Sequence, residues 1–300
     1  MSNVTSKTVF FQTVGNMARE FLAMPLVIAL VAVGVDVAAA PYDFDVHLHS
    51  EEVEPHEFEA DAALLPVLAA AKTTRSASSL FDFTGATAGG PIWILPKSQN
   101  PQLLFLSVGT EELSAADFQS LIQFSLVSVT GSAGGPAPGV FSVWDVDAFA
   151  QVQPLMSSAS GASVPNAFSV PAAAHTHFNY GFTSPGLYNV EFEVTATLAA
   201  ALGGGPVSGS ATYSFGVFDT GADYVVPSST PWTYQGQQFT VALFGNEHID
   251  MGVGLVAVPE PSALVLAGLG LAGLVGARVN RRRPAASRQN ARFFRLFRCG

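Results

Sequence analysis

Two short histidine pairs are the residues whose type and spacing best suit chemistry. His47 and His49 form one pair, His175 and His177 form the other, and one residue separates the members of each pair. In an extended strand, side chains two residues apart project from the same face. Each pair therefore presents two imidazoles side by side, and four nitrogens would converge if the two strands were neighbours. Because imidazole binds zinc, copper, nickel and iron, the sequence predicts a site for Zn²⁺ or another divalent metal.

Polar residues beside the two pairs supply further donors. Asp43 and Asp45 share the predicted face of the first pair, and Asn179 shares the face of the second. We expect them to act as accessory ligands or as acceptors that orient the imidazoles. His56 stands in the acidic stretch 51–61, whose negative charge attracts cations. The alternative reading is a solvated acidic strand edge with incidental histidines.

The sequence lacks the common catalytic motifs. It contains neither the Gly-x-Ser-x-Gly motif of serine hydrolases nor a Gly-Lys-Ser/Thr phosphate loop. Its single cysteine, Cys299, lies in a basic C-terminal segment, so neither a disulfide framework nor a cysteine metal site can form within the chain. We therefore predict that the protein is not an enzyme.

The charges of the chain are segregated along its length. Residues 41–258 carry 20 acidic side chains against Lys72, Arg75 and Lys97, whereas eight of the 13 basic residues lie in 278–300. A region this acidic is repelled by the phosphates of nucleic acids. Nucleic-acid binding is thus excluded for the central region.

The composition and residue pattern of the central region, 41–257, predict an all-β domain. The chain has 28 Gly, 19 Pro and only 12% charged residues, a composition typical of turn-rich β proteins. Polar and apolar residues alternate over 43–49, with Phe44, Val46 and Leu48 on one face. We predict one antiparallel β-sandwich of Ig-like or jelly-roll type over 41–257, with a split near 150–165 as the alternative. Further strands are expected at 91–95, 103–108, 121–130, 140–146, 175–183, 187–198, 210–218, 237–244 and 249–256.

Glycine and proline mark the turns between these strands. The segment 131–139 (GSAGGPAPG) predicts a hairpin connection between the strands on either side of it. Ser184-Pro185-Gly186 predicts a type II turn. Ser114 is positioned to cap a short helical turn that follows it.

The N-terminal segment 1–40 has the pattern of a secretory signal peptide. Arg19 precedes the apolar run 21–35, and three alanines follow at 38–40. The run is short for a membrane span. Export is therefore predicted, with Met17 as an alternative start and a buried helix as the alternative structure.

The C-terminal region contains three elements in order. Pro259-Glu260-Pro261 is followed by the apolar run 263–277 and then by the cluster Arg281, Arg282 and Arg283. A proline hinge, an apolar helix and a positive stop predict a transmembrane helix that keeps its arginines in the cytoplasm. A basic tail, 284–300, comes after the cluster.

The segment 258–283 resembles the PEP-CTERM sorting signal of Gram-negative bacteria that make exopolysaccharide. The resemblance implies an inner-membrane intermediate, recognition and cleavage near the Pro-Glu-Pro motif by an exosortase, and display at the cell surface or in the extracellular matrix. A plain membrane anchor is the alternative. The tail 284–300 departs from the pattern, since such signals usually end soon after the arginines.

A second resemblance covers about 45–218. The run 175–188 (HTHFNYGFTSPGLY) is similar to a signature of bacterial choice-of-anchor M surface domains, with Tyr180 where tryptophan is common. The runs 44–49, 81–83, 92–96 and 99–109 also look similar to that family. The resemblance implies an exported domain, and it adds to the case for metal binding because such domains often accompany zinc or manganese transporters.

Three functions follow as hypotheses. The first is an exosortase-sorted surface or exopolysaccharide-matrix protein with a structural or adhesive β-sandwich that binds a divalent metal. The second is a metal-capture protein that serves a zinc or manganese transporter. The third is a carbohydrate-binding module, in which Trp93, Trp144 or Trp232 would stack on sugar rings, although burial is the usual fate of tryptophan.

Overall fold

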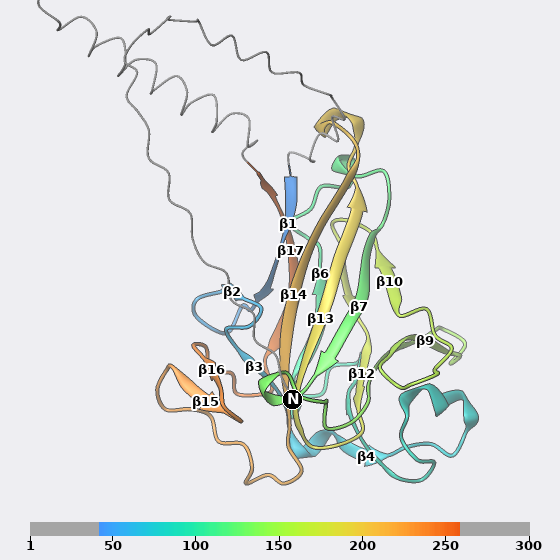
Figure 1. Cartoon of the computed structure of the whole chain (residues 1–300), viewed down its shortest axis with the longest axis vertical. Helices are drawn as coiled ribbons and strands as arrows, with labels where there is room; N and C mark the ends of the chain where they lie inside the picture. Colours follow the sequence, from blue (N-terminus) through green and yellow to red (C-terminus); the bar gives the residue numbers. More distant parts are fainter. Residues whose placement is uncertain (1–41, 259–300) are drawn as a thin grey trace, which may run out of the picture. The chain divides into compact units, whose positions relative to one another are not determined.

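The computed structural model describes residues 42–258, in which the regular secondary structure consists of strands and a few short 3₁₀ turns, connected by loops (Figure 1). Among them, no helix is both long enough and apolar enough to cross a membrane. The predicted signal peptide 1–40, the Pro-Glu-Pro motif, the transmembrane helix, the arginine cluster and the tail 284–300 lie outside the described residues. The strands are β1 (Tyr42–His49), β2 (Glu57–Glu59), β3 (Leu64–Val67), β4 (Lys72–Thr74), β5 (Pro91–Leu95), β6 (Phe105–Gly109), β7 (Ile122–Thr130), β8 (Phe141–Val146), β9 (Val152–Ser157), β10 (Ala167–Val170), β11 (His175–His177), β12 (Asn179–Phe182), β13 (Gly186–Thr197), β14 (Pro206–Val217), β15 (Trp232–Tyr234), β16 (Gln237–Phe239) and β17 (His248–Ala257).

The strands form three five-stranded sheets and one small hairpin. The first sheet has the order β11-β6-β17-β1-β2, the second β10-β7-β13-β14-β3, and the third β4-β5-β12-β8-β9, while β15 pairs with β16. Most neighbours are antiparallel, as predicted, but β17 pairs with β6 and β14 pairs with β3 in parallel. The expectation of a purely antiparallel fold is therefore wrong at these two pairs, where a long connection returns the chain to the same end of the sheet.

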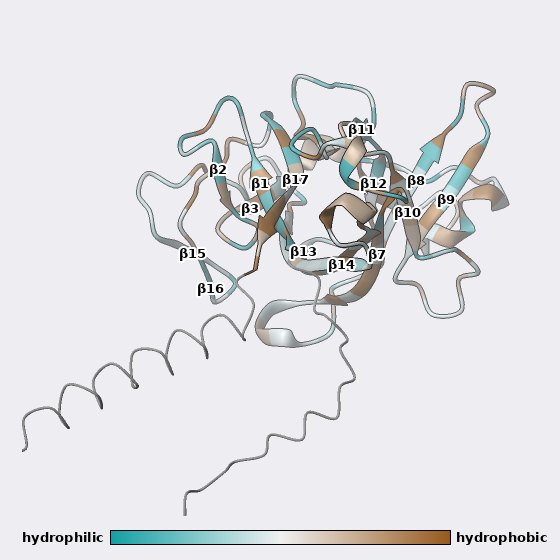
Figure 2. Ribbon diagram, turned by 90° about the horizontal axis from the view of Figure 1, so that it is seen from above, coloured by the Kyte–Doolittle hydropathy of each residue, from teal (hydrophilic) through white to brown (hydrophobic). Residues whose placement is uncertain are grey.

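The first and second sheets face one another across the main core. Figure 2 shows β1 and β17 opposite β13 and β14 when the strands are viewed end-on. The predicted alternation in β1 is confirmed, since Phe44, Val46 and Leu48 are buried in this core. At Gly209 of β14 the sheets come so close that an added Cβ would lie 2.4 Å from the carbonyl oxygen of Phe44. A side chain there would push the two sheets apart.

Aromatic side chains connect the third sheet to the second. The ring of Phe215 in β14 lies 6.0 Å from that of Phe141 in β8 and 5.2 Å from that of Phe182 in β12, measured between centroids. All three residues are fully buried. Burial of large aromatic rings contributes strongly to stability, so this cluster fixes the third sheet against the rest of the core.

The segment predicted as a hairpin and the segment predicted as a type II turn both lead from one sheet to another. Segment 131–139 leaves β7 in the second sheet and enters β8 in the third, and Ser184-Pro185-Gly186 leads from β12 in the third sheet to β13 in the second. The hairpin prediction for 131–139 is wrong. Turn residues determine where the chain bends, but the pairing of the following strand depends on contacts with distant strands.

The short helical turn predicted after Ser114 is present. Ala115–Asp117 form a 3₁₀ turn, and the Ser114 side chain accepts a hydrogen bond from the backbone N–H of Ala116. In the segment 237–244, only Gln237–Phe239 form a strand, which pairs with β15 alone. β17, expected at 249–256, lies in the middle of the first sheet, between β6 and β1.

The aromatic cluster generates a stability prediction. The substitution Phe215→Ala should lower the free energy of unfolding by about 3–5 kcal/mol, because loss of the ring leaves a cavity where two sheets meet. Phe149→Ala is the matched control, since Phe149 is 83% exposed and should change the value by less than about 0.5 kcal/mol. Urea unfolding followed by tryptophan fluorescence measures both. Equal effects of the two substitutions would contradict the packing described.

Candidate metal centre

One face of the first sheet collects polar and ionisable side chains in aligned rows. In one row, His177 of β11, Ser107 of β6, Asp250 of β17 and His49 of β1 are successive cross-strand partners. The next row runs through His175, Gly109, Gly252 and His47. The opposite face carries the buried core residues of the same strands, such as Leu106, Ile249 and Met251. The strict alternation of the strands thus separates a core face from a histidine-bearing face.

Small residues on β6 leave room for histidines to meet above it. Ser107 and Gly109 have little or no side chain on this face, so residues of β11 and β17 can lean across β6 toward one another. Phe105 closes one end of this space. Its ring stacks on His177, with centroids 3.8 Å apart and an angle of 14° between the planes, and it also contacts His248 at 5.0 Å.

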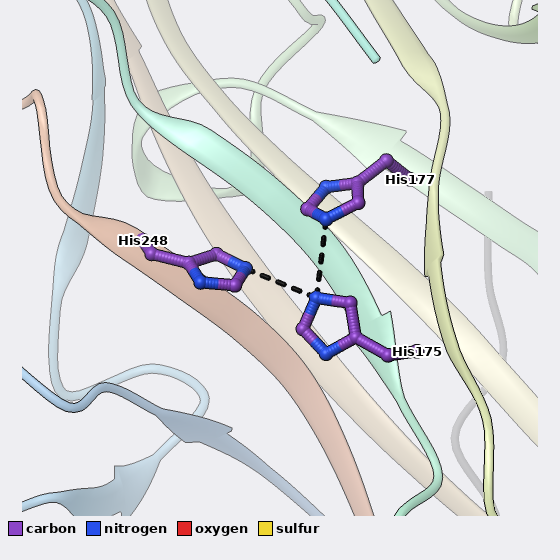
Figure 3. Close-up of side chains that lie close together, drawn as sticks. All are labelled: His175, His177 and His248. Atoms are coloured by element: carbon purple, nitrogen blue, oxygen red, sulfur yellow. Dashed lines mark hydrogen bonds between the residues drawn. The ribbon is translucent and has the colours of Figure 1, made fainter. Parts of the chain in front are cut away.

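Three imidazoles converge in this space (Figure 3). The Nε2 atom of His175 lies 3.1 Å from Nε2 of His177 and 3.1 Å from Nε2 of His248. The three residues therefore offer a compact set of metal-ligand atoms. Nitrogens bound to one tetrahedral Zn²⁺ at the usual bond length lie about 3.3 Å from one another. The observed separations are close to that spacing.

The hydrogen bonds behind two of the rings fix which nitrogen carries the proton. Nδ1 of His177 lies 3.1 Å from the carbonyl oxygen of Leu106, which can only accept, so Nδ1 donates. Nδ1 of His175 donates in the same way to the carboxylate of Glu111, at 2.7 Å. In the neutral rings both Nε2 atoms are then unprotonated and face each other. Such an arrangement requires a cation or an added proton between them, and a carboxylate or carbonyl behind a histidine is the usual support of a metal ligand.

Asp250 adds an oxygen donor to this set. Its Oδ1 atom lies 3.2 Å from Nε2 of His248 and 3.7 Å from Nε2 of His175, and it accepts a hydrogen bond from the hydroxyl of Ser107. The residue is almost fully buried. A buried carboxylate needs compensating donors or a cation, so Asp250 is suited to complete a site with three histidines and one carboxylate.

A solvent-open hollow of about 370 Å³ extends from these residues along the sheet. Its lining includes four carboxylates and, among the described residues that form it, no lysine or arginine. Their combined negative charge raises the local concentration of cations. The four carboxylates belong to Glu51, Glu111, Glu112 and Asp250.

Burial keeps His177 in its ligating form. Desolvation lowers the pKa of His177 below its ordinary value, the hydrogen bond with Leu106 opposes this effect, and the neighbouring His175 and His248 add to it. A lowered pKa favours the neutral ring near pH 7. Only the neutral imidazole binds metal.

The structure unites one predicted histidine pair and separates the other from it. His175 and His177 lie together, but β6 and β17 stand between β11 and β1, so the condition for all four imidazoles to converge, neighbouring strands, is not met. His49 lies at the rim of the hollow, with Nδ1 3.6 Å from Oδ2 of Asp250. His47 is buried, and its Nε2 atom lies 3.1 Å from Oε1 of Glu112.

The predicted accessory residues are not among the groups that converge. Asp43 and Asp45 are exposed on β1, beyond the histidine pair. Asn179 has a structural role, since its amide NH₂ donates to the carbonyl of Trp144 and its Oδ1 accepts from the backbone N–H of Lys97. His56 bonds to the carbonyl of Ser50 and approaches Glu54.

Three members of the centre escaped the sequence analysis. His248 and Asp250 form a His-x-Asp pair that alternates with buried residues in β17, which is the same signal that identified the histidine pairs. Glu111 lies two residues after the end of β6. Its role depends on the pairing of β6 with β11, which the sequence does not reveal.

Comparisons with known proteins identify the C-terminal segment. The family model of the PEP-CTERM protein-sorting motif matches residues 257–283, which confirms the predicted sorting signal. The motif indicates exosortase-dependent export, with a membrane-associated intermediate and display at the cell surface. No curated protein and no solved structure matches the chain, and no family match supports the resemblance of residues 45–218 to choice-of-anchor M domains.

The floor of the hollow generates a second stability prediction. A Cβ added to Gly252 would lie 2.4 Å from Nε2 of His47, so Gly252→Ala should cost about 1–3 kcal/mol of unfolding free energy. In a His47→Ala background this cost should fall below about 0.5 kcal/mol, because the clash is removed. Thermal or urea unfolding of the four variants measures the coupling.

Gly221→Ala provides the control for that cycle. Nothing lies within 4 Å of a Cβ added to Gly221, so the substitution should be close to neutral. A cost at Gly252 that persists without His47 would show that the ring does not lie over this glycine.

Proposed function

We propose that the protein is an exported surface protein whose β-domain captures a divalent transition metal. The observation that carries the proposal is the convergence of three histidine Nε2 atoms, two of them left unprotonated by hydrogen bonds to Leu106 and Glu111. A nitrogen-rich set with one carboxylate suits Zn²⁺ and its neighbours in the first transition row. The ligands would be His175, His177, His248 and Asp250.

The position of the site within the first sheet supports capture from the surroundings. Tyr42 pairs with Ala257 at the end of the β1–β17 ladder, beside the start of the sorting motif, whereas His49 pairs with Asp250. Seven residues of strand separate the two positions, about 24 Å at the usual rise. The metal-binding end of the ladder is thus remote from the end at which the sorting segment begins.

Exchange of the metal with solvent fits the site better than a purely structural role. The hollow is open, and the core behind the sheet is continuous without any contribution from the histidine face. Four protein ligands are also typical of structural zinc sites, but the hollow beside these ligands is open to solvent. We therefore favour metal capture over the structural or adhesive role. That role and a location in the exopolysaccharide matrix both stay predictions.

The carbohydrate-binding alternative receives no support from the tryptophans. Trp93 and Trp144 are buried, and Trp232 packs on Phe239 while its Nε1–H donates to the carbonyl of Val241. Burial thus removes Trp93 and Trp144 as stacking platforms, and Trp232 is held partly buried against Phe239.

We also propose a fold class, a related family and a recipient of the metal for this domain. The facing first and second sheets favour the β-sandwich class, and the run 175–188 favours a relative of the choice-of-anchor M domains. We propose binding without catalysis, and a zinc or manganese transporter as the recipient of the metal.

Metal affinity tests the proposal. Isothermal titration of the chelator-stripped protein with Zn²⁺ should show binding, and His248→Ala should weaken it by more than about 100-fold. Glu111→Gln should weaken it less, by roughly 10–100-fold, because Glu111 supports a ligand from behind.

His56→Ala is the matched control for these titrations. His56 is a partly exposed histidine whose ring contacts Ser50 and Glu54 rather than the three-histidine cluster, so its loss should leave affinity unchanged. Absence of binding to the wild-type protein, or equal affinity of wild type and His248→Ala, would overturn the proposal.

A further inference from the structure

We infer that the hollow holds two divalent cations, bridged by the carboxylate of Asp250. The first is the ion of the three-histidine cluster, so this inference rests on the proposed function. The second would lie between Asp250 and His49, at the part of the hollow nearer β1. The three-histidine cluster alone does not determine how many ions the hollow holds or which residues bind a second ion.

The two oxygens of Asp250 face different imidazoles. Oδ1 is directed toward His175 and His248, whereas Oδ2 lies 3.6 Å from Nδ1 of His49. Asp250 is held in this orientation by burial and by the hydroxyl of Ser107. A carboxylate fixed with one oxygen toward each of two nitrogen groups has the geometry of a bridging ligand.

The contact between His49 and Asp250 is too long for a hydrogen bond. N–H···O bonds are about 2.7–3.2 Å long, whereas Nδ1 and Oδ2 are 3.6 Å apart. That separation suits two ligands of one divalent ion, whose bonds to nitrogen and oxygen are each about 2.0–2.2 Å long. The other ring nitrogen of His49, Nε2, approaches Glu51 to 4.0 Å. Glu51 is largely exposed and lies too far from the ring for a hydrogen bond, so this contact is looser than that between Glu111 and His175.

Further oxygen donors line the same hollow. A carboxylate oxygen of Glu111 falls within 4.8 Å of the ligand atoms of His175 and Asp250. Glu112 is positioned by a contact between its carboxylate and Nε2 of His47. The other ring nitrogen of His47, Nδ1, is buried and has no hydrogen-bond partner among the described residues. A buried N–H without a partner is costly, so the proton of His47 resides on Nε2 and is donated to Glu112.

The charge of the hollow also favours the binding of cations. Its four carboxylates carry a formal charge of −4, and histidine is the only other titratable residue type in its lining. One divalent cation leaves half of this charge uncompensated, whereas two balance it. Because the second position has one imidazole among carboxylates, it suits a harder ion such as Mn²⁺ better than the first position does.

Ion counting tests the inference on the full-length chain, purified in detergent and stripped by chelation. After loading with Zn²⁺ and Mn²⁺ together and dialysis, elemental analysis should find two ions per chain in the wild type. His49→Ala should retain one ion, predominantly zinc, because the three-histidine cluster is intact. Asp250→Asn should lose the second ion and weaken the first.

The matched control and a spectroscopic readout complete the experiment. His56→Ala should retain two ions, and circular dichroism should show that every variant is folded. The Mn²⁺ electron paramagnetic resonance spectrum of the zinc-loaded wild type should show bound ion that is absent in His49→Ala. One ion in both wild type and His49→Ala would overturn the second position while sparing the first. No ion in the wild type would overturn both.

Discussion

The pairing of β17 between β6 and β1 is the constraint on which the candidate centre depends. It places Asp250 opposite Ser107 on one side and His49 on the other, and it brings His248 within reach of His175 across β6. A shift of one residue in either ladder would turn these side chains into the core and bring Ile249 or Met251 to the surface. The burial of the apolar partners in β17 therefore fixes the register, and the register positions the proposed metal ligands.

Glycine and serine are as important to this geometry as the ligands. Side chains from β11 and β17 meet only because β6 offers Ser107 and Gly109 between them, and the ring of His47 lies over Gly252. A sheet face with larger residues at these positions would fill the hollow. The small residues convert a flat sheet face into a concave, negatively charged surface.

The sequence predicts the local features of this protein better than its long-range ones. The alternation in β1, the sorting motif and the capped turn after Ser114 depend on neighbouring residues and are confirmed. The crossing of 131–139 between sheets and the two parallel strand pairs depend on partners far along the chain, which a single sequence does not specify. The candidate site shows the same division. His175 and His177 are recognisable from their spacing. The separation of β11 from β1 follows from the sheet topology alone, and it explains why His248 and Asp250, rather than His47 and His49, lie beside them.

We propose that the imidazoles of His175, His177 and His248 share one metal ion. X-ray absorption spectroscopy at the zinc edge, on protein loaded with one equivalent of Zn²⁺, tests this proposal because the scattering of imidazole rings identifies histidine ligands. We expect the zinc ion to have about three imidazole nitrogens and at least one oxygen as ligands, at about 2.0–2.2 Å from the metal. A zinc ion surrounded only by oxygen ligands would contradict the account, since it would place the metal among the carboxylates and away from His175, His177 and His248.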